Sequence, residues 1–344
     1  MQGPTPPTTG TAPRPGTAGW MRPLGRTGLT VSAVCAGGSP LGSMPALYGR
    51  DVSRDEGIAT VRAVLDSPIR TIDTSNGYSD GESERRIGAA LAAVGGKPAD
   101  VVVITKVDAD GRDYSGDRVR ASVAESMQRL GLEHLPLVHL HDPEHFEFAE
   151  LTAPGGAVDA LVGLKESGLV GSIGLAGGRV QEIARYLALG VFDVLLVHNR
   201  WTLLDRSAGD LLADAAERGL GLVNAAVYGG GILAGGGAGP ARYGYRPAPP
   251  EILRAVEAMR RVCDRHGTDL RTAALQFSLR DPRFATTVVG MSRPERVGAT
   301  VAAAAQEVPD ALWDELEALL PPTHVWLDAP LRPRSTPPLA EGSR

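Results

Sequence analysis

Residues 69–78 read Ile-Arg-Thr-Ile-Asp-Thr-Ser-Asn-Gly-Tyr, and this stretch decides the fold predicted for the 344-residue chain. The β-branched run from Ile69 to Ile72 predicts a short buried strand, which the polar Ser-Asn-Gly loop cannot continue. The strand therefore places a carboxylate, Asp73, and a phenol, Tyr78, at its carboxyl end.

Two further apolar runs also end in a titratable side chain. Residues 101–105 run into Lys106, and residues 135–140 run into His141. In a parallel barrel the carboxyl ends of the strands meet on the face that carries the active site, so these groups are expected to converge with the acid and the phenol above. His139 points the same way on an extended strand, but His141 stands at the strand end, which favours His141 as the functional residue.

Short apolar strands and amphipathic helical patterns alternate along the chain. Eight strands and eight helices in this order predict an α/β fold, the closed (β/α)8 TIM barrel, instead of an open doubly wound sheet. The fingerprint G-x-G-x-x-G of nucleotide-binding open sheets does not open the first unit. The predicted strands span 33–36, 69–73, 101–105, 135–140, 170–175, 193–197, 221–226 and 285–289, and the predicted helices span 55–66, 82–93, 117–130, 156–167, 179–189, 208–218, 250–266 and 294–304.

The two ends of the chain differ in composition from the alternating part. Residues 1–19 are almost wholly Pro, Thr, Gly and Ala, with little apolar surface to offset the entropy of ordering, so a disordered tail is expected. A β-hairpin over residues 21–32 is expected to cap one end of a barrel domain spanning residues 20–325. A last helix over 309–320 and the Pro-rich segment after it are expected to pack across the barrel mouth, before a C-terminal tail over 326–344.

The composition argues against several classes of partner. A net charge of −5 and a pI near 5.8 offer no basic field for nucleic acid or for an anionic membrane surface. No apolar run approaches the ~18 residues of a membrane span, and the N-terminus lacks the charged-then-apolar order of a signal peptide. Cys35 and Cys263 have neither disulfide-framework nor metal-site spacing. We therefore expect a cytoplasmic protein that binds a small molecule and no metal, with no sequence signal of its oligomeric state.

Four motifs in order along the chain resemble those of the aldo-keto reductase superfamily. The resemblance implies a barrel that binds NAD or NADP without a Rossmann domain. It also carries the catalytic tetrad of the superfamily onto Asp73, Tyr78, Lys106 and His141. The motifs are the hairpin at 22–37, the stretch 72–91, Ile104-Thr-Lys-Val107 and Leu137-Val-His-Leu-His-Asp142.

The tetrad residues suit the interconversion of an alcohol and a carbonyl by hydride transfer. The phenol of Tyr78 would give or take the hydroxyl proton, but a phenol of pKa ~10 is a poor base at neutral pH. An ammonium at Lys106 would lower that pKa, and Asp73 would hold the lysine charged and in place. His141 would hydrogen-bond the substrate oxygen and orient it, and the nicotinamide would supply the hydride chemistry.

Two glycine-bearing segments resemble cofactor loops. The glycines of residues 223–234 allow the close backbone approach that a pyrophosphate requires, and residues 290–297 open a helix whose N–H groups and arginines could hold an adenosine phosphate. Gly290 stands where NADP-specific members of the superfamily often carry lysine, so either nucleotide is expected. The expected cofactor contacts are His198, Gly229, Gly231, Leu233, Gly290, Ser292, Arg293 and Arg296.

Residues 197–206, with shorter motifs at 37–42, 223–226 and 231–234, resemble aldose 1-dehydrogenases of the L-fucose, L-galactose and D-threo-aldose type, with pyridoxal 4-dehydrogenases close by. The resemblance implies oxidation of a cyclic hemiacetal to a lactone. Small residues in the loops and 5% aromatic residues indicate a site open to a polyhydroxylated ring. The expected substrate contacts are Asn76, Asn199 and Arg200 for the hydroxyls and Trp201 for the apolar face of the ring.

Three alternatives remain open. A general aldehyde or ketone reductase would use the same site, and a pyridoxal 4-dehydrogenase would apply the same hemiacetal chemistry to a flatter ring. A non-enzymatic nucleotide-sensing subunit would need no tetrad, and the complete tetrad argues against it.

Overall fold

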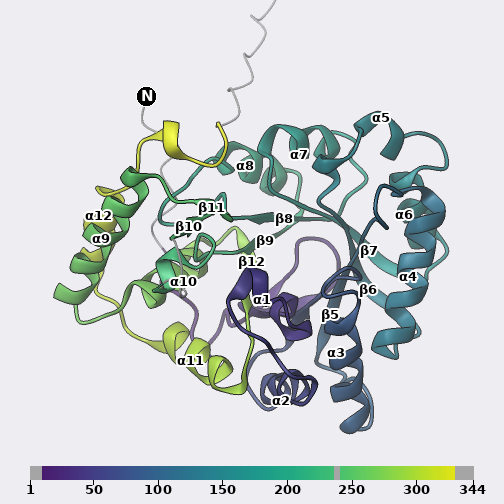
Figure 1. Cartoon of the computed structure of the whole chain (residues 1–344), viewed down its shortest axis with the longest axis horizontal. Coiled ribbons are helices and arrows are strands. Elements are labelled where there is room, and N and C mark those ends of the chain that lie inside the picture. Colours follow the sequence, from purple (N-terminus) through teal and green to yellow (C-terminus); the bar gives the residue numbers. More distant parts are fainter. Residues whose placement is uncertain (1–9, 236–240, 330–344) are drawn as a thin grey trace, which may run out of the picture.

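A closed barrel forms the centre of the computed structural model, which describes residues 10–235 and 241–329 of the chain. Eight parallel strands pair in the order β12-β3-β4-β5-β6-β7-β8-β9 and close on themselves, with helices around them (Figure 1). The predicted (β/α)8 barrel is therefore confirmed. The strands are β3 (Val34–Gly37), β4 (Thr71–Asp73), β5 (Val102–Val107), β6 (Leu135–His141), β7 (Val170–Gly177), β8 (Val194–His198), β9 (Gly221–Ala225) and β12 (Phe284–Gly290).

Each predicted barrel helix is present within about two residues of its expected ends. The strict alternation is wrong after β9, because a second long helix, α10 (Leu270–Arg280), follows α9 before the last strand begins. Almost every residue of α10 is buried, so the helix lacks the polar face by which surface helices are recognised. The other helices are α2 (Arg54–Leu65), α3 (Glu82–Ala93), α4 (Gly116–Leu130), α6 (Ala157–Glu166), α7 (Val180–Leu187), α8 (Gly209–Glu217), α9 (Pro250–Arg265) and α11 (Pro294–Ala305).

The expected hairpin closes the amino-terminal end of the barrel. Strands β1 (Met21–Pro23) and β2 (Thr30–Ser32) pair antiparallel. Leu24 and Val31 are fully buried in a cluster with side chains of the barrel interior. Arg22 donates to the carbonyl of Phe284, at the start of β12, at 2.7 Å. The carboxyl end of the barrel is therefore the end left for a functional site.

Short elements lie in the loops that follow the carboxyl ends of the strands. The alternation of side-chain direction along a strand stops where the loop begins. The short elements of the loops therefore determine which side chains reach the barrel mouth. They are η1 (Ser39–Gly42) and α1 (Pro45–Tyr48) after β3, η2 (Pro143–His145) and α5 (Phe148–Leu151) after β6, and η3 (Ile232–Ala234), β10 (Arg242–Tyr243) and β11 (Arg246–Pro247) after β9.

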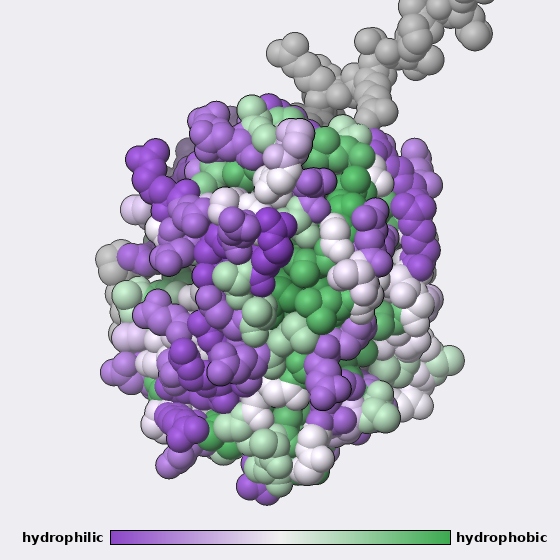
Figure 2. Space-filling view, turned by 90° about the vertical axis from the view of Figure 1, so that its right-hand side faces the viewer, coloured by the Kyte–Doolittle hydropathy of each residue, from purple (hydrophilic) through white to green (hydrophobic). Residues whose placement is uncertain are grey.

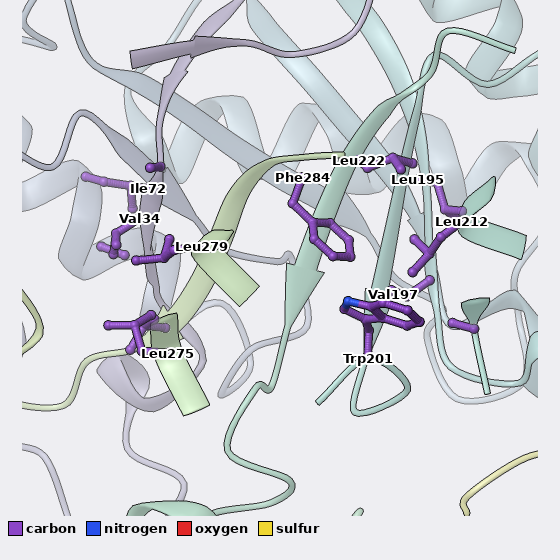
Figure 3. Packing of buried hydrophobic residues seen from close by; sticks show 14 of the residues in the cluster. Val34, Ile72, Leu195, Val197, Trp201, Leu212, Leu222, Leu275, Leu279 and Phe284 are labelled. Atoms are coloured by element: carbon purple, nitrogen blue, oxygen red, sulfur yellow. The ribbon is translucent and has the colours of Figure 1, made fainter. Parts of the chain in front are cut away.

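The apolar core has two layers, one inside the barrel and one between the barrel and its helices. Figure 3 shows Val34, Leu195, Leu222 and Phe284 of the strands among the buried side chains, together with Leu275 of α10. On the side of the molecule that carries α4 and α6, hydrophilic side chains border a strip of apolar ones (Figure 2). Within the described ranges, none of the helices combines the length and the apolar character needed to span a membrane.

The N-terminal segment departs from the expected disordered tail of residues 1–19. Residues 1–9 lie outside the described residues. Ala12 is buried in the core cluster, and Arg14 forms an ion pair with Glu307 at 2.9 Å. The segment from residue 10 to residue 19 therefore packs on the barrel, because a single small apolar side chain and an arginine find partners there.

The C-terminal segment departs from expectation as well. Helix α12 (Ala311–Glu317) does not cross the mouth but packs beside α9, where Glu315 meets His266 at 2.7 Å. The chain after α12 does reach the loops of the mouth, since the backbone N–H of Leu327 donates to Asp205 at 2.8 Å. The packed part of the chain thus extends beyond the domain boundary expected at residue 325.

Candidate active site

Asp73, Lys106 and Tyr78 meet at the carboxyl ends of β4 and β5. The Lys106 ammonium donates to Asp73 Oδ1 at 2.6 Å, to the Thr74 carbonyl at 2.7 Å and to the Tyr78 hydroxyl at 3.2 Å. Asp73 and Lys106 are both buried. An ammonium has three protons, so these contacts occupy all of its donors. The Tyr78 oxygen accepts from Lys106, which leaves the phenolic proton free to be donated to a ligand.

The net pKa shift of Tyr78 in this structure is upward, opposite to the lowering expected from Lys106. Burial raises the pKa of Tyr78 well above its ordinary value, and nearby acidic groups, Asp73 foremost, raise it further. The Asp73 carboxylate lies closer to the ammonium than the phenol does and neutralises its charge. Tyr78 is therefore a protonated hydrogen-bond donor.

His141 is held by a carboxylate that the sequence analysis did not single out. His141 Nδ1 lies 2.7 Å from Asp108 Oδ1 and 3.1 Å from Ser75 Oγ. Asp108 Oδ2 accepts from the backbone N–H of Gly77 at 2.7 Å and from the Ser75 hydroxyl. Although burial opposes both charges, the pairing raises the pKa of His141 and lowers that of Asp108. The ring is thus fixed with Nδ1 toward the carboxylate, and Nε2 is the nitrogen left for a ligand.

His139 occupies the interior of the barrel below the mouth. It is fully buried, and no hydrogen-bond partner for either ring nitrogen occurs among the described residues. A Cβ at Gly174 would lie 2.1 Å from His139 Nδ1, so glycine at that position makes room for the ring. Burial, followed by the charges of Lys106 and His141, lowers the pKa of His139 well below its ordinary value. His139 is a neutral packing residue in this structure, while His141 belongs to the tetrad cluster.

Asp142, Glu144 and His198 form a polar group beside His141. One ligating atom from each of the three lies within 4.8 Å of the others. Asp142 Oδ2 is 3.8 Å from His141 Nε2, and Asp142 Oδ1 is 3.6 Å from His198 Nε2. In the described part of the chain, neither Asp142 Oδ1 nor Glu144 Oε2 meets a hydrogen-bond donor, although both atoms are buried. These two oxygens are acceptors that a ligand can satisfy.

Two tyrosines stand at the rim of the mouth. Tyr48 and Tyr245 are 39% and 44% exposed. The Tyr48 hydroxyl donates to Ser39 Oγ at 2.7 Å. Burial raises the pKa of Tyr245, a hydrogen bond with Asn199 opposes the rise, and the charge of Asp142 adds to it. Aromatic rings therefore border the site, which the low aromatic content of the chain did not indicate.

The glycine-rich loop after β9 has a left-handed backbone conformation, which glycine adopts readily. Gly229, Gly230 and Gly231 have φ angles of 60°, 79° and 99°. Leu233, in η3, is buried, so the backbone of this turn is the part that can face a ligand. The loop packs on α10, where Arg271 donates to the Ala234 carbonyl at 2.7 Å.

An arginine cluster lies where α11 begins. Arg293 is the N-cap residue of α11, Arg296 lies in its first turn, and Arg271 approaches from α10. Burial lowers the pKa of Arg296, and repulsion from Arg271 and Arg293 lowers it further. Arg271 Nε is buried and meets no acceptor within the described residues. Clustered cations at a helix N-terminus fit a phosphate group, so these residues suit the nucleotide cofactor expected from Gly290 to Arg296.

The structure does not bring the expected substrate contacts together. Asn76 turns toward α4 and donates to the Ser122 carbonyl at 3.1 Å and to Glu125 at 3.0 Å. Trp201 is 1% exposed and lies in the apolar core (Figure 3). Arg200 is held in an ion pair with the C-terminal segment at 3.0 Å.

Of the four expected substrate contacts, Asn199 lies beside the polar group of Asp142, Glu144 and His198. Its backbone is left-handed, with φ of 61°, and its amide nitrogen is 3.3 Å from His198 Nδ1. Asp142 is left-handed too, with φ of 43°. Sequence patterns do not give the direction of a side chain after such a turn. Asp108 could have been found, because it follows Lys106 by two residues and the strand period of two places both on one face.

Together these features define a class of protein: a barrel oxidoreductase with an acid, an ammonium, a phenol and an imidazole at its mouth and an arginine cluster where its last barrel helix begins. The chain belongs to the aldo/keto reductase family, whose sequence profile matches residues 33–321. The resemblance inferred from the four motifs is thus confirmed. Proteins of this family are oxidoreductases that use NAD(P)H.

Several characterised proteins resemble the chain over most of its length. The pyridoxal 4-dehydrogenase of Microbacterium luteolum is 32% identical, over 86% of this chain and 96% of its own length. The D-threo-aldose 1-dehydrogenase of a Pseudomonas species is 33% identical, with the same coverage of 86% and 96%. The L-galactose dehydrogenase of Arabidopsis thaliana is 33% identical over 88% of this chain and 94% of its own length.

Solved structures share the fold at lower identity. The holo form of an aldo-keto reductase from Bacillus halodurans superposes with a TM-score of 0.72 at 22% identity, covering 87% of this chain and 96% of its own. The glycerol dehydrogenase of Gluconobacter oxydans gives 0.70 at 19% identity, covering 93% and 100%. These two matches support the barrel fold.

Proposed function

We propose that the chain is a nicotinamide-dependent dehydrogenase that oxidises the anomeric hemiacetal of an aldose to a lactone. The observation that carries this proposal is a matched set of groups at the mouth, in which Tyr78 offers a donor, His141 leaves Nε2 free for a ligand and Asp142 offers an acceptor. A hydroxyl group that is to be oxidised needs an acceptor for its proton and a donor to its oxygen. The similarity to proteins named D-threo-aldose 1-dehydrogenase and L-galactose dehydrogenase supports the same substrate class.

The polar group beside the tetrad supports a substrate with several hydroxyls. Asp142 Oδ1 and Glu144 Oε2 are buried acceptors without a donor among the described residues. A Cβ at Gly177 would lie 2.4 Å from Glu144 Oε2, so glycine there makes room for the carboxylate. Leaving a buried acceptor unmet costs roughly 1–3 kcal/mol. A ring carrying hydroxyls next to its anomeric carbon could meet these acceptors, and a simple aldehyde could not.

The cofactor assignment rests on the glycine loop and the arginine cluster. Gly229, Gly231, Ser292, Arg293 and Arg296 would hold the phosphates and the adenosine end, and His198 would meet the nicotinamide end. The bound nicotinamide would accept the hydride from the substrate carbon. Both NAD and NADP would bind, with any preference for NADP depending on Arg296.

Product analysis tests the proposal. The protein is incubated with L-fucose, L-galactose or D-arabinose and either oxidised nicotinamide, while absorbance reports the reduced cofactor and NMR identifies the lactone. We expect lactone and reduced cofactor in equal amounts, and none with the Tyr78→Phe variant on the same time scale. Efficient reduction of simple aldehydes without lactone from any sugar would favour a general reductase instead.

Oxidation of pyridoxal is the second candidate, because its cyclic hemiacetal undergoes the same chemistry. Tyr48 and Tyr245 at the rim offer aromatic faces to a flat ring, and the Microbacterium luteolum relative is named for this activity. Comparing kcat/KM for pyridoxal with that for the sugars separates the two. A preference for pyridoxal that is lost in Tyr245→Ala would establish the flat-ring substrate.

We also propose a cytoplasmic location. Cys35 and Cys263 are both buried free thiols. Burial raises the pKa of each thiol, which keeps both in the unreactive protonated form. This state agrees with a reducing compartment, and fractionation of the native organism's cells tests it.

A further inference from the structure

Strands β10 and β11 form a hairpin whose turn carries a tyrosine in a backbone conformation that is unusual for this residue type. The two strands pair so that Gly244 and Tyr245 alone connect them. The φ angles of these two residues are 53° and 69°. Two-residue turns with positive φ at both positions favour glycine and asparagine, because a larger side chain strains the left-handed backbone. Tyr245 therefore stands in a strained turn.

Contacts with three other segments hold this turn in place. The side chain of Tyr243, just before the turn, is buried and donates to Asp205 Oδ2 at 2.8 Å. The backbone N–H of Leu327 donates to the same oxygen, and a Cβ at Gly244 would lie 2.5 Å from the Leu327 side chain. The N–H of Gly244 donates to the carbonyl of Gly229 in the glycine-rich loop at 3.3 Å. A strained backbone persists only where its surroundings fix it in this way.

The side chain of Tyr245 reaches the polar group beside the tetrad. Its hydroxyl is hydrogen-bonded to Asn199, which is fully buried. The amide nitrogen of Asn199 is 3.3 Å from His198, and His198 is 3.6 Å from Asp142. On the other side stands Tyr48 of α1, where burial raises the pKa of the phenol to about 12 and a charge on Tyr245 would raise it further. The Tyr245 ring therefore lies between the polar group and the rim formed by α1.

One face of the Tyr245 ring is left without a partner. Almost half of the residue is exposed, and no ring–ring or cation–ring contact within the described residues involves it. Phe148 and Phe277, by contrast, each pack against another ring and a guanidinium group. An open aromatic face next to buried acceptors suits a ligand ring that is apolar on its face and polar at its edge.

We propose that Tyr245 is a specificity-determining residue that contacts the substrate: the strained turn holds its ring over the mouth, where the open face packs on the face of a cyclic hemiacetal whose hydroxyls meet Asp142. An acyclic aldehyde offers no such face, so Tyr245 selects ring substrates over chain substrates. The identity of the cyclic substrate rests on the function proposed above, whereas the strain in the turn does not.

The first experiment needs neither cofactor nor substrate. Tyr245→Gly and Tyr245→Ala both remove the ring, but only the alanine variant keeps a Cβ in the left-handed turn. Glycine usually destabilises a protein relative to alanine, through the entropy of the unfolded chain. At this position we expect the reverse, with a Tm roughly 1–3 °C higher for Tyr245→Gly than for Tyr245→Ala.

Leu189 supplies the matched control for this comparison. It lies in the turn after α7, is 38% exposed and has no positive φ. Leu189→Ala should therefore melt above Leu189→Gly, in the usual order. The same order at position 245 would mean that the turn is not strained, and the inference would be overturned.

The second experiment compares a cyclic with an acyclic substrate in the same variants. For oxidation of L-galactose by Tyr245→Ala we expect KM to rise about 3–10-fold with kcat little changed, because a contact with the ring face is lost. The kinetics of propanal reduction should not change. Tyr245→Phe keeps the ring face and should keep a KM close to that of the wild type. Leu189→Ala should behave as wild type with both substrates.

Three results would count against the contact with the ring face. An equal rise in KM for L-galactose and propanal would show that the hairpin acts through the fold. A matching rise in the Kd of NADH or NADPH would show that it acts through the cofactor. A loss in Tyr245→Phe as large as that in Tyr245→Ala would assign the contact to the hydroxyl and not to the face.

The two proposals fail separately. If the wild type oxidises neither sugars nor pyridoxal, the hemiacetal assignment is lost. Tyr245 is then tested by reduction of cyclohexanecarboxaldehyde and propanal, and the inference requires that Tyr245→Ala raise KM for the cyclic aldehyde alone. If wild type and Tyr245→Ala oxidise L-galactose with the same KM, the assignment of Tyr245 is lost and the aldose assignment stands.

Discussion

Lys106 has three proton donors and gives them to Asp73, Thr74 and Tyr78. The closest of the three acceptors is the carboxylate of Asp73, at 2.6 Å, and the phenol is the most distant. A buried ion pair of this kind cancels most of the field that a lone ammonium would exert on the phenol. Lys106 therefore orients Tyr78 and occupies one lone pair of its oxygen.

Replacing Tyr78 with Phe tests the donor assigned to the phenol. The change removes the hydrogen bond to the substrate oxygen but leaves the ring, so we expect kcat to fall about 10²–10³-fold. Steady-state kinetics measures the loss. Fluorescence titration should show cofactor affinity close to that of the wild type, since the phenol is part of the tetrad and not of the arginine cluster. Turnover near the wild-type value would contradict the assignment of Tyr78 to the reacting centre.

Asp142→Asn tests the acceptor beside the tetrad. A hydrogen bond from a sugar hydroxyl to this carboxylate would be worth about 1.5–3 kcal/mol, so kcat/KM for an aldose should fall roughly 10–150-fold. A simple aldehyde, which brings no hydroxyl to Asp142, should lose less in the same variant. Comparing the two substrates within one variant removes any common effect of the lost charge on His141. An equal fall in kcat/KM for the aldose and the simple aldehyde would show that Asp142 does not accept a hydrogen bond from a sugar hydroxyl.

At the scale of elements, the loop that presents Tyr78 is tied to helix α4. Glu125 on α4 accepts from Arg118 at 2.8 Å, from Asn76 at 3.0 Å and from Arg129 at 3.3 Å. Asn76 stands two residues before Tyr78. The polar side chain expected to touch the substrate therefore anchors the loop instead.

Glu125→Gln should loosen this anchor. The hydrogen bond with Arg118 is the main cause that lowers the pKa of Glu125 to about 2, and the side chain is 35% exposed, so screening limits the effect. We expect a Tm about 1–4 °C lower at pH 7. The carboxylate is favoured in the folded state, so its contribution is present above the unfolded pKa of ~4.3 and is lost as pH falls through the folded pKa.

Calorimetry against pH measures this change. The Tm difference between Glu125→Gln and wild type should shrink below about pH 4. Glu257→Gln, which removes an exposed acid that pairs with Arg260 and Arg261 on α9, is the matched control. A pH-independent difference would mean that packing, and not the carboxylate charge, holds the loop.

Sequence predicts helices well where one face is buried and barrel strands where a short apolar run stands between polar turns, and it fails where neither pattern applies. Short apolar runs marked all eight barrel strands, and the residues at or directly after their ends led to Asp73, Lys106 and His141. Helix α10 escaped because it is buried on all sides. Trp201 and Asp142 lie in turns after strands, where no period fixes side-chain direction, and so one was placed wrongly in the site and the other was missed.

At the scale of the whole molecule, positive charge is concentrated at one place although the chain as a whole is negative. The chain carries −5 overall, yet Arg271, Arg293 and Arg296 gather where α11 begins. These cations come from α10 and from the start of α11, elements that the fold brings together. The fold holds the three guanidinium groups close together although their like charges repel one another. A bound phosphate would relieve that repulsion.

Arg296→Ala decides whether this cluster reads the 2′-phosphate of NADP. A charge-assisted contact to that phosphate would contribute about 1.5–3 kcal/mol, so we expect the Kd for NADPH to rise roughly 10–150-fold and the Kd for NADH to change little. The NADPH effect should shrink as salt is added, because the contact is electrostatic and partly exposed to solvent. Fluorescence titration of the two nucleotides at low and high salt gives both quantities. Arg254→Ala on α9, where the side chain is 70% exposed, serves as the control for a general loss of positive charge. If Arg296→Ala weakens both nucleotides equally, the arginine contacts a phosphate common to both, and the choice between NAD and NADP must then be made by another residue at the mouth.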